Sequence, residues 1–136
     1  MAVEQTKWAD LQQAALRAQR QAYAPYSNYR VGAAVLGDDG QIYTGCNIEN
    51  ASYGLTVCAE RNAIGAAIAC GVRAIEAVMV YSDGAAAATP CGACRQVIAE
   101  FTTNCAVLCV SSDGDRLETS VGELLPHAFA PRVLQA

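Results

Sequence analysis

Three cysteines and one glutamate stand at a spacing that suits a metal-assisted reaction. The motif CAE at residues 58–60 is followed, about thirty residues later, by PCGAC at residues 90–94. The candidate ligands are Cys58, Cys91 and Cys94. Thiolates bind Zn²⁺ well, and three protein ligands leave one position of a tetrahedral ion open, which separates a catalytic zinc site from a structural one. Glu60 is not needed as a ligand and could transfer protons for a water molecule at the open position.

Parts of this pattern also fit simpler interpretations. The pair Cys91 and Cys94 alone would suit a redox-active dithiol or half of a structural zinc knuckle. A structural site needs a fourth ligand, and the only histidine, His127, lies in a short tail and is interpreted as a structural or surface residue. A redox pair would require neither Cys58 nor Glu60. The combined pattern favours a catalytic zinc site, with a non-enzymatic, zinc-stabilised interaction module as the more distant alternative.

The metal hypothesis requires both motifs to lie at helix entrances. Cys91 and Cys94, at positions i and i+3, share a helix face, and Pro90 suits the first turn, where its missing N–H costs nothing. The positive end of the helix dipole would favour the thiolate forms. On an ideal helix, residues two apart point about 200° away from each other. Cys58 and Glu60 can therefore serve one site only if Cys58 lies just before its helix becomes regular.

Hydrophobic periodicity and turn residues predict a single α/β domain spanning residues 1–136. Apolar residues three or four apart from Trp8 to Ala22 predict an amphipathic helix that ends before Pro25. The other predicted helices cover residues 58–70, 91–101 and 121–125, and the predicted strands cover residues 31–36, 42–46, 75–81, 106–110 and 116–119. This order fits a sheet of about five strands with helices on its faces.

The composition favours a small, freely diffusing substrate over a nucleic acid. Thirteen acidic residues against nine basic ones give a net charge of −4, and the sequence has no run of Lys and Arg. A protein that binds nucleic acid normally carries a basic patch that replaces counterions. The hydrophobic share is 53%, much of it alanine, and from this we expect apolar surface to be buried between subunits.

Cysteine usage predicts a reduced, intracellular chain without membrane contact. The chain has seven cysteines, an odd number, and residues 1–10 are polar and mixed rather than a hydrophobic signal segment. No apolar run reaches the roughly 20 residues that a membrane span needs. The cysteines outside the candidate metal site are expected to be small core residues. They are Cys46, Cys70, Cys105 and Cys109.

Further motifs extend the pattern along nearly the whole chain. They are YAPYS at 23–27, VGAA at 31–34, GCNIENASY at 45–53, CAER at 58–61, PCGACRQ at 90–96, ELLP at 123–126 and AF at 128–129. A ligand-x-Glu motif followed by Pro-Cys-x-x-Cys is typical of zinc deaminases that act on nucleobases. Taken together, the motifs resemble the cytidine deaminases, in the small homotetrameric form whose zinc ligands are all cysteines.

This resemblance implies a fold and an activity. The fold would be a three-layer α-β-α arrangement with a central mixed sheet of about five strands. The activity would be the zinc-dependent hydrolysis of free cytidine and 2′-deoxycytidine to uridine and 2′-deoxyuridine with release of ammonia, a step of pyrimidine salvage. The enzyme would be a cytoplasmic homotetramer with one Zn²⁺ per subunit and sites completed across subunit interfaces. The alternative is a deaminase of another small amino-heterocycle, such as an aminonucleoside antibiotic.

The resemblance also assigns roles to individual residues. Cys58, Cys91 and Cys94 would hold zinc, and Glu60 would be the proton shuttle. Asn47 and Glu49 would hydrogen-bond the ribose, chiefly its 3′-hydroxyl, and their presence favours a ribonucleoside substrate. The other substrate contacts would be Tyr29, Ala51, Tyr53, Ala59 and Phe129, with Phe129 supplied by a neighbouring subunit, and with Ala51 and Tyr53 lining the site across an interface. Arg61 and Gln96 would lie near the metal, with Arg61 donating hydrogen bonds to ligand sulfurs.

Overall fold

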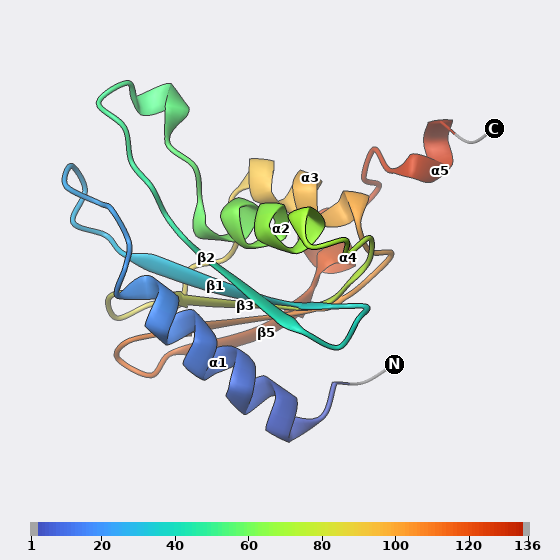
Figure 1. Cartoon of the computed structure of the whole chain (residues 1–136), viewed down its shortest axis with the longest axis horizontal. Coiled ribbons are helices and arrows are strands. Elements are labelled where there is room, and N and C mark those ends of the chain that lie inside the picture. Colours follow the sequence, from blue (N-terminus) through green and yellow to red (C-terminus); the bar gives the residue numbers. More distant parts are fainter. Residues whose placement is uncertain (1–2, 135–136) are drawn as a thin grey trace.

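The chain folds around one five-stranded mixed sheet (Figure 1). The computed structural model describes residues 3–134. The strands are β1 (Val31–Gly37), β2 (Ile42–Cys46), β3 (Ile75–Ser82), β4 (Ala106–Ser111) and β5 (Arg116–Ser120). Their order across the sheet is β2, β1, β3, β4, β5. Neighbouring strands are antiparallel except for β3 and β4, which are parallel.

Helices cover both faces of this sheet, as Figure 1 shows. They are α1 (Gln5–Gln19), α2 (Ala59–Ala69), α3 (Gly92–Glu100), α4 (Val121–Leu124) and α5 (Pro131–Leu134), with a single 3-10 turn at Tyr53–Leu55. Helix α1 packs on one face, in a cluster with Met79 and Leu108. Helices α2 and α3 pack on the other face, in a cluster with Val80 and Val107. The predicted α/β class, with three layers and a mixed sheet, is therefore confirmed.

Strand β3 lies at the centre of the sheet and is apolar on both faces. Val78 and Val80 belong to the core under α2 and α3, while Ala77 and Met79 belong to the core under α1. The chain passes from β3 through α3 to the parallel strand β4, which is the usual role of a crossover helix. The loop that leaves β3 after Ser82 therefore leads to the entrance of α3.

A glycine lets α2 lie against the edge strand β2. A Cβ atom at Gly45 would overlap the backbone nitrogen of Ala63 and would lie 2.6 Å from the carbonyl oxygen of Ala59, both in α2. Separations this short do not occur for real Cβ atoms, so any larger residue at position 45 would push α2 away. Because α2 begins directly after Cys58, this contact also sets the position of the first predicted metal ligand.

Some details differ from the sequence prediction. Helix α1 ends at Gln19, so Ala22 is not helical, and the next amide, that of Tyr23, donates to the carbonyl of Asn47 instead. The expected core position of Cys70 is wrong, because this residue is exposed where the chain leaves α2. Cys46 is partly buried, and the remaining two cysteines outside the metal motif are buried as expected. Among residues 3–134, no helix combines the length and the apolarity that a bilayer crossing requires.

Candidate metal centre and substrate site

The three predicted metal ligands lie together. Sγ of Cys91 is 3.7 Å from Sγ of Cys58 and 3.6 Å from Sγ of Cys94, and all three sulfurs lie within 4.8 Å of one another. A disulfide bond would bring two sulfurs to about 2.05 Å, and all seven cysteines are free. Thiolates placed tetrahedrally at about 2.3 Å from one zinc ion would be about 3.8 Å apart. The donor set and its spacing therefore fit Zn²⁺.

Both halves of the cluster lie at helix entrances. Cys58 directly precedes α2 with an extended backbone (φ −71°, ψ 156°), and Cys91 precedes α3 in the same way (φ −66°, ψ 169°). Cys94 lies in the first turn of α3, and Glu60 is the second residue of α2. Because the backbone at Cys58 is not helical, the opposition of about 200° that a regular helix would impose between Cys58 and Glu60 does not apply. Both helix dipoles favour thiolates at this point.

Electrostatics within the cluster also favour a divalent cation. Hydrogen bonding with Cys94, and then with Arg61, lowers the pKa of Cys58 to about 5 against the opposing effect of burial. The same hydrogen bond with Cys58, together with burial, raises the pKa of Cys94. One thiol therefore ionises easily, while a second thiolate beside it would be repelled. A divalent cation removes this repulsion and allows all three sulfurs to be ligands.

Glu60 is a buried acid beside the cluster. Only 4% of its surface is exposed. Burial raises the pKa of Glu60 to about 7, and the charge on Cys58 adds to this rise, while its own backbone amide and Arg61 oppose it. The charge on Glu60 in turn contributes to the raised pKa of Cys94, so the carboxyl group and the sulfurs interact. A carboxyl group with a pKa near 7 can both accept and return a proton.

Two arginines make hydrogen bonds at or beside the cysteine cluster. Arg61 donates a hydrogen bond from Nη2 to Sγ of Cys58 across 3.5 Å. Its Nε is buried and has no hydrogen-bond partner among residues 3–134. Arg95 donates to the carbonyl oxygens of Pro90 (2.7 Å) and Leu124 (2.8 Å). Arg61 therefore acts on a ligand sulfur, whereas Arg95 fixes the backbone just before the second ligand.

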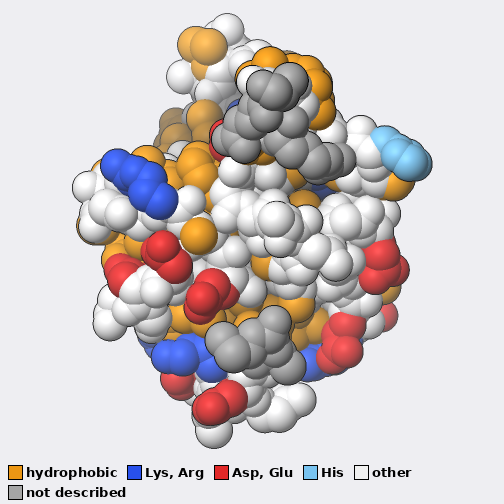
Figure 2. Space-filling view, turned by 90° about the vertical axis from the view of Figure 1, so that its right-hand side faces the viewer, with side chains coloured by type: hydrophobic (Ala, Val, Ile, Leu, Met, Phe, Trp, Pro, Cys, Tyr) orange, Lys and Arg blue, Asp and Glu red, His pale blue; other side chains and the backbone are white. Residues whose placement is uncertain are grey.

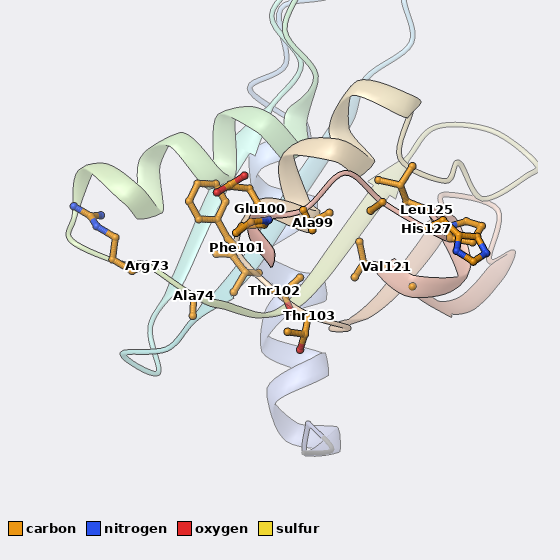
Figure 3. A pocket seen from close by; sticks show the side chains of 16 residues that line it. Arg73, Ala74, Ala99, Glu100, Phe101, Thr102, Thr103, Val121, Leu125 and His127 are labelled. Atoms are coloured by element: carbon orange, nitrogen blue, oxygen red, sulfur yellow. The ribbon is translucent and has the colours of Figure 1, made fainter. Parts of the chain in front are cut away.

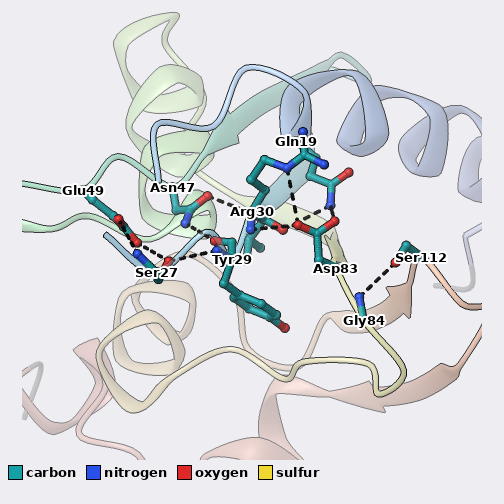
Figure 4. Close-up of polar contacts among 10 residues, drawn as sticks. Gln19, Ser27, Tyr29, Arg30, Asn47, Glu49, Asp83, Gly84 and Ser112 are labelled. Carbon is teal, nitrogen blue, oxygen red and sulfur yellow. Dashed lines mark hydrogen bonds and ion pairs between the residues drawn. The ribbon is translucent and has the colours of Figure 1, made fainter. Parts of the chain in front are cut away.

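Asn47 and Glu49 reach from an extended segment to the loop before β1 (Figure 4). Asn47 donates from Nδ2 to the carbonyl of Tyr29 (2.8 Å) and accepts on Oδ1 from the amide of Val31 (2.9 Å). Glu49 accepts from two consecutive loop amides and from the hydroxyl of Ser27. The Ser27 hydroxyl and these amides hold the pKa of Glu49 below its ordinary value. Asn47 and Glu49 each retain unused hydrogen-bonding capacity.

The three predicted aromatic contacts are exposed. The exposed fractions of Tyr29, Tyr53 and Phe129 are 40%, 74% and 60%. The ring of Tyr53 packs edge-to-face against Tyr26, with 5.8 Å between ring centroids. A cavity of about 390 Å³ is lined by both rings and by Glu49, but by none of the three cysteines of the cluster. These aromatic side chains are therefore available to a molecule outside the single chain.

The remaining predicted residues lie at different depths. Ala59 is buried as the first residue of α2, and Ala51 is exposed in the loop before the 3-10 turn. Gln96 is exposed and donates from Nε2 to the carbonyl of Phe129 across 2.7 Å. This hydrogen bond ties α3 to the C-terminal segment, so Gln96 positions the backbone of Phe129 rather than bonding a ligand sulfur.

A separate cavity, of about 660 Å³, lies between the start of β3, the end of α3 and the C-terminal segment (Figure 3). Its lining includes Arg73, Glu100 and His127 but none of the predicted site residues. His127 is exposed and adopts a positive φ of 56°. Its imidazole is not among the donors of the metal cluster, which agrees with the interpretation of His127 as a structural or surface residue.

Sequence patterns did not single out Gln19 or Asp83 and assigned no role to Arg95, although all three make hydrogen bonds around the site. Gln19 is only 4% exposed and lies four residues after Ala15, on the buried face of α1. A polar residue on a buried helical face is a signal for a specific hydrogen bond. That partner is Asp83, the first residue after β3, whose Oδ1 accepts from Nε2 of Gln19 at 2.8 Å.

Sequence comparisons agree with this geometry. The family model described as the cytidine and deoxycytidylate deaminase zinc-binding region matches residues 5–110. A cytidine deaminase from Sporosarcina psychrophila is 51% identical over 115 residues, which cover 84% of this chain and 85% of that protein. A cytidine deaminase from Halalkalibacterium halodurans is 49% identical over 116 residues, which cover 85% of this chain and 88% of that protein.

A structural comparison gives the same result. The crystal structure of cytidine deaminase from Burkholderia pseudomallei matches with a TM-score of 0.85 and 47% identity, over 89% of this chain and 98% of that chain. A blasticidin-S deaminase from Bacillus cereus is less similar, at 32% identity over 111 residues, which cover 76% of this chain and 79% of that protein. The chain thus shares both sequence and fold with such proteins over most of its length.

Proposed function

The chain belongs to the family of cytidine and deoxycytidylate deaminases, and from this premise we propose that it hydrolyses cytidine and 2′-deoxycytidine to uridine and 2′-deoxyuridine, with release of ammonia. The observation that carries the proposal is the cluster of three sulfurs at two helix entrances, with the buried acid Glu60 in the first turn of α2. The whole chain would act as one catalytic domain. Deamination of an aminonucleoside antibiotic is less favoured, because the blasticidin-S deaminase is the more distant relative.

Each group at the metal centre has a distinct task. Cys58, Cys91 and Cys94 would hold one Zn²⁺ per subunit, and the bound ion would supply the Lewis acidity for activating a water molecule near neutral pH. Glu60 would accept one proton as water adds to C4 of the cytosine ring, and would deliver this proton to ring N3. It would then take the second proton from the new C4 hydroxyl and deliver it to the exocyclic amine, so that C4 becomes a carbonyl and the amine leaves as ammonia. Arg61 offsets the negative charge of the sulfur ligands.

Asn47 and Glu49 would bind the sugar. Asn47 has one N–H and one lone pair left after its bonds to Tyr29 and Val31, so it can donate to one hydroxyl and accept from another. The pKa of Glu49 is lowered, so its carboxylate stays ionised and accepts from a hydroxyl. Tyr29 would supply a stacking surface, and buried Ala59 would offer its backbone beside the ring.

The exposed aromatic side chains support a homotetramer. Tyr53 and Phe129 present large apolar surfaces to solvent in the single chain, and Ala51 is exposed next to Tyr53. Burial of such surfaces between subunits would stabilise an oligomer. In this arrangement Phe129, Tyr53 and Ala51 of one subunit complete the nucleoside site of a neighbour. Gln96 would contribute indirectly, through its hydrogen bond to the carbonyl of Phe129.

Charge and cysteine chemistry suit a free nucleoside in the cytoplasm. The net charge is −4, and on the face drawn in Figure 2 the basic side chains are separated from one another by acidic and uncharged ones. A nucleic acid would need a continuous basic surface. All seven cysteines are free, as is usual in a reducing compartment. A role in pyrimidine salvage follows from the proposed substrates.

The decisive experiment measures the fall in ultraviolet absorbance as cytidine is consumed, together with ammonia release. We expect turnover with cytidine and 2′-deoxycytidine, and loss of turnover after treatment with a chelator strong enough to remove zinc. Addition of zinc should restore activity. Metal-loaded protein that releases ammonia from blasticidin S but not from cytidine would favour the alternative substrate. No ammonia from any nucleoside would favour the zinc-stabilised interaction module.

A further inference from the structure

Asp83, directly after β3, joins two separate parts of the chain (Figure 4). Its Oδ1 accepts from Nε2 of Gln19 at 2.8 Å, and its Oδ2 accepts from the backbone amide of Arg30 at 3.1 Å and from Nε of Arg30 at 3.4 Å. The amide of Asp83 donates back to the carbonyl of Arg30 at 3.2 Å. That carbonyl also accepts from Nε2 of Gln19 at 3.1 Å. Both the N–H and the carbonyl of the Arg30 backbone are therefore hydrogen-bonded.

Arg30 lies between the two residues that orient Asn47. The carbonyl of Tyr29 accepts from Nδ2 of Asn47, and the amide of Val31 donates to Oδ1. These two bonds fix the orientation of the side-chain amide of Asn47. If this amide were flipped, its NH2 group would face the Val31 N–H and its oxygen would face the Tyr29 carbonyl. Asn47 itself is largely buried, with 9% of its surface exposed. Any displacement of the Arg30 backbone therefore moves both partners of Asn47.

The side chain of Gln19 is buried and donates two hydrogen bonds. Gln19 is the last residue of α1 and is 4% exposed. A Cβ atom at Gly32 would lie 2.6 Å from the backbone nitrogen of Gln19, so this end of α1 is pressed against β1. A buried amide is unfavourable unless it is hydrogen-bonded. The bonds to Asp83 and to the Arg30 carbonyl use both N–H groups of the Gln19 side chain.

We propose that Asp83, together with Gln19, is a positioning residue that orients Asn47 for the sugar of the nucleoside. The inference rests on the proposed function, which assigns Asn47 to ribose binding. Asp83 acts through the backbone of Arg30 and does not itself touch the nucleoside. The Arg30 side chain is half exposed, so its ion pair with Asp83 contributes little to holding this segment in place. The effect therefore comes from the Arg30 amide and from Gln19.

The test compares cytidine with 2′,3′-dideoxycytidine, which lacks the hydroxyls that Asn47 would bind. In the zinc-loaded Asp83→Ala variant, we expect kcat/KM for cytidine to fall roughly tenfold, mainly through a higher KM, because a lost ground-state contact raises KM. For the dideoxynucleoside we expect a fall of less than about threefold. A change that only loosened the fold would lower both values by the same factor. Zinc content should equal that of the wild type.

Three further variants make the test specific. Glu118→Ala is the matched control, because it removes the other ion pair, which has the same 3.4 Å separation but lies on β5, and it should behave like the wild type. Asp83→Asn keeps an acceptor for the Arg30 amide but turns an NH2 group toward Nε2 of Gln19, so it should recover only part of the loss. Gln19→Met keeps the length of the side chain but lacks donors. It should give the same substrate dependence, and it replaces Asp83→Ala if that variant does not fold.

The outcomes separate this inference from the proposed function. Equal losses on both substrates in Asp83→Ala, or in Gln19→Met if it replaces that variant, overturn the positioning role. Unchanged kinetics with cytidine in the variant tested also overturn it. Wild-type, zinc-loaded protein that releases no ammonia from either nucleoside contradicts the proposed function instead.

Discussion

Arg61 and Cys58, three residues apart at the entrance of α2, are joined by a hydrogen bond from Nη2 to Sγ across 3.5 Å. This contact raises the pKa of the guanidinium and lowers that of the thiol, so both groups stay charged. A thiolate sulfur that accepts such a hydrogen bond donates less electron density to a bound metal ion. The acidity of a metal ion held by Cys58 would therefore depend in part on Arg61, which is not itself a ligand.

Replacing Arg61 should weaken the metal centre without unfolding the protein. In Arg61→Ala we expect zinc affinity or activity to fall by about 10- to 100-fold, as is typical when a group that bonds a metal ligand is lost. Arg61→Lys keeps the charge but not the planar fork, and should give an intermediate loss. Competition with a zinc-binding dye and ammonia release measure the two quantities. Wild-type values for both in Arg61→Ala would exclude this role.

Glu60→Gln should retain zinc and lose turnover. The substitution keeps the size of a buried side chain but removes the group that moves protons. Because positioned acid–base groups typically contribute 10²- to 10⁴-fold, we expect kcat to fall by at least about 100-fold. Atomic absorption checks the metal content, and ammonia release checks the rate. If more than about a tenth of the activity remained, Glu60 could not be the proton shuttle.

Removal of the metal should make further thiols reactive. In the native protein we expect Ellman's reagent to label exposed Cys70 and to spare the buried thiols of Cys105 and Cys109, whose pKa values burial raises to about 11 and about 12. A strong chelator should add Cys58 and Cys91 to the count and abolish ammonia release, whereas Cys94, which is buried and whose pKa is raised, should react slowly. An unchanged thiol count after complete removal of zinc would contradict ligation by these residues.

The entrance of α2 could be predicted from the sequence because its chemistry is local. The requirement that Cys58 and Glu60 serve one site forces Cys58 to lie before the regular helix, and the structure has it there. The order of helices and strands followed from periodicity and turn residues for the same reason. The exposure of Cys70 could not be predicted, because its apolar neighbours in the sequence do not reveal on which side α2 faces the sheet.

Contacts between distant segments could not be predicted in the same way. Asp83 and Gln19 are 64 residues apart, and only the sheet and α1 together bring them within 2.8 Å. Gln96 donates to the carbonyl of Phe129, which lies 33 residues later in the chain, and this bond likewise forms only in the folded protein. Side-chain partners of this kind depend on packing rather than on local spacing.

Two glycine substitutions should have opposite effects on stability. Gly45→Ala would force a methyl group into the backbone of α2, and we expect it to lower the free energy of unfolding by about 2 kcal/mol or more. Gly65→Ala, inside α2, has open space around its Cβ and should raise that free energy by about 0.5–1 kcal/mol. Urea unfolding of the two variants measures both. A neutral Gly45→Ala would mean that α2 is not held tightly against β2.

The contact between Glu49 and Ser27 should weaken in acid. Because the folded protein lowers the pKa of Glu49 from 4.5, its carboxylate stabilises the fold above that pH, and this contribution is lost as the pH falls through the folded-state value. The stability difference between the wild type and Glu49→Gln should therefore stay constant from pH 7 to about 4.5 and shrink below that pH, as the pH falls through the lowered folded-state pKa. Ser27→Ala should raise the pKa of Glu49 in an NMR titration. An unshifted titration in Ser27→Ala would contradict the hydrogen bond.

The loop between Asp83 and Cys91 is held by the hairpin that follows it in the chain. Gly84 donates its amide to Oγ of Ser112 at 2.9 Å, as Figure 4 shows, and Ala87 donates to Oδ2 of Asp115 at 2.8 Å. During translation the ribosome therefore adds all three cysteines and Glu60 to the chain before it adds the turn that holds this loop. We expect a nascent chain ending near Phe101 to bind zinc poorly, and the metal to be captured only when the last third of the polypeptide has emerged.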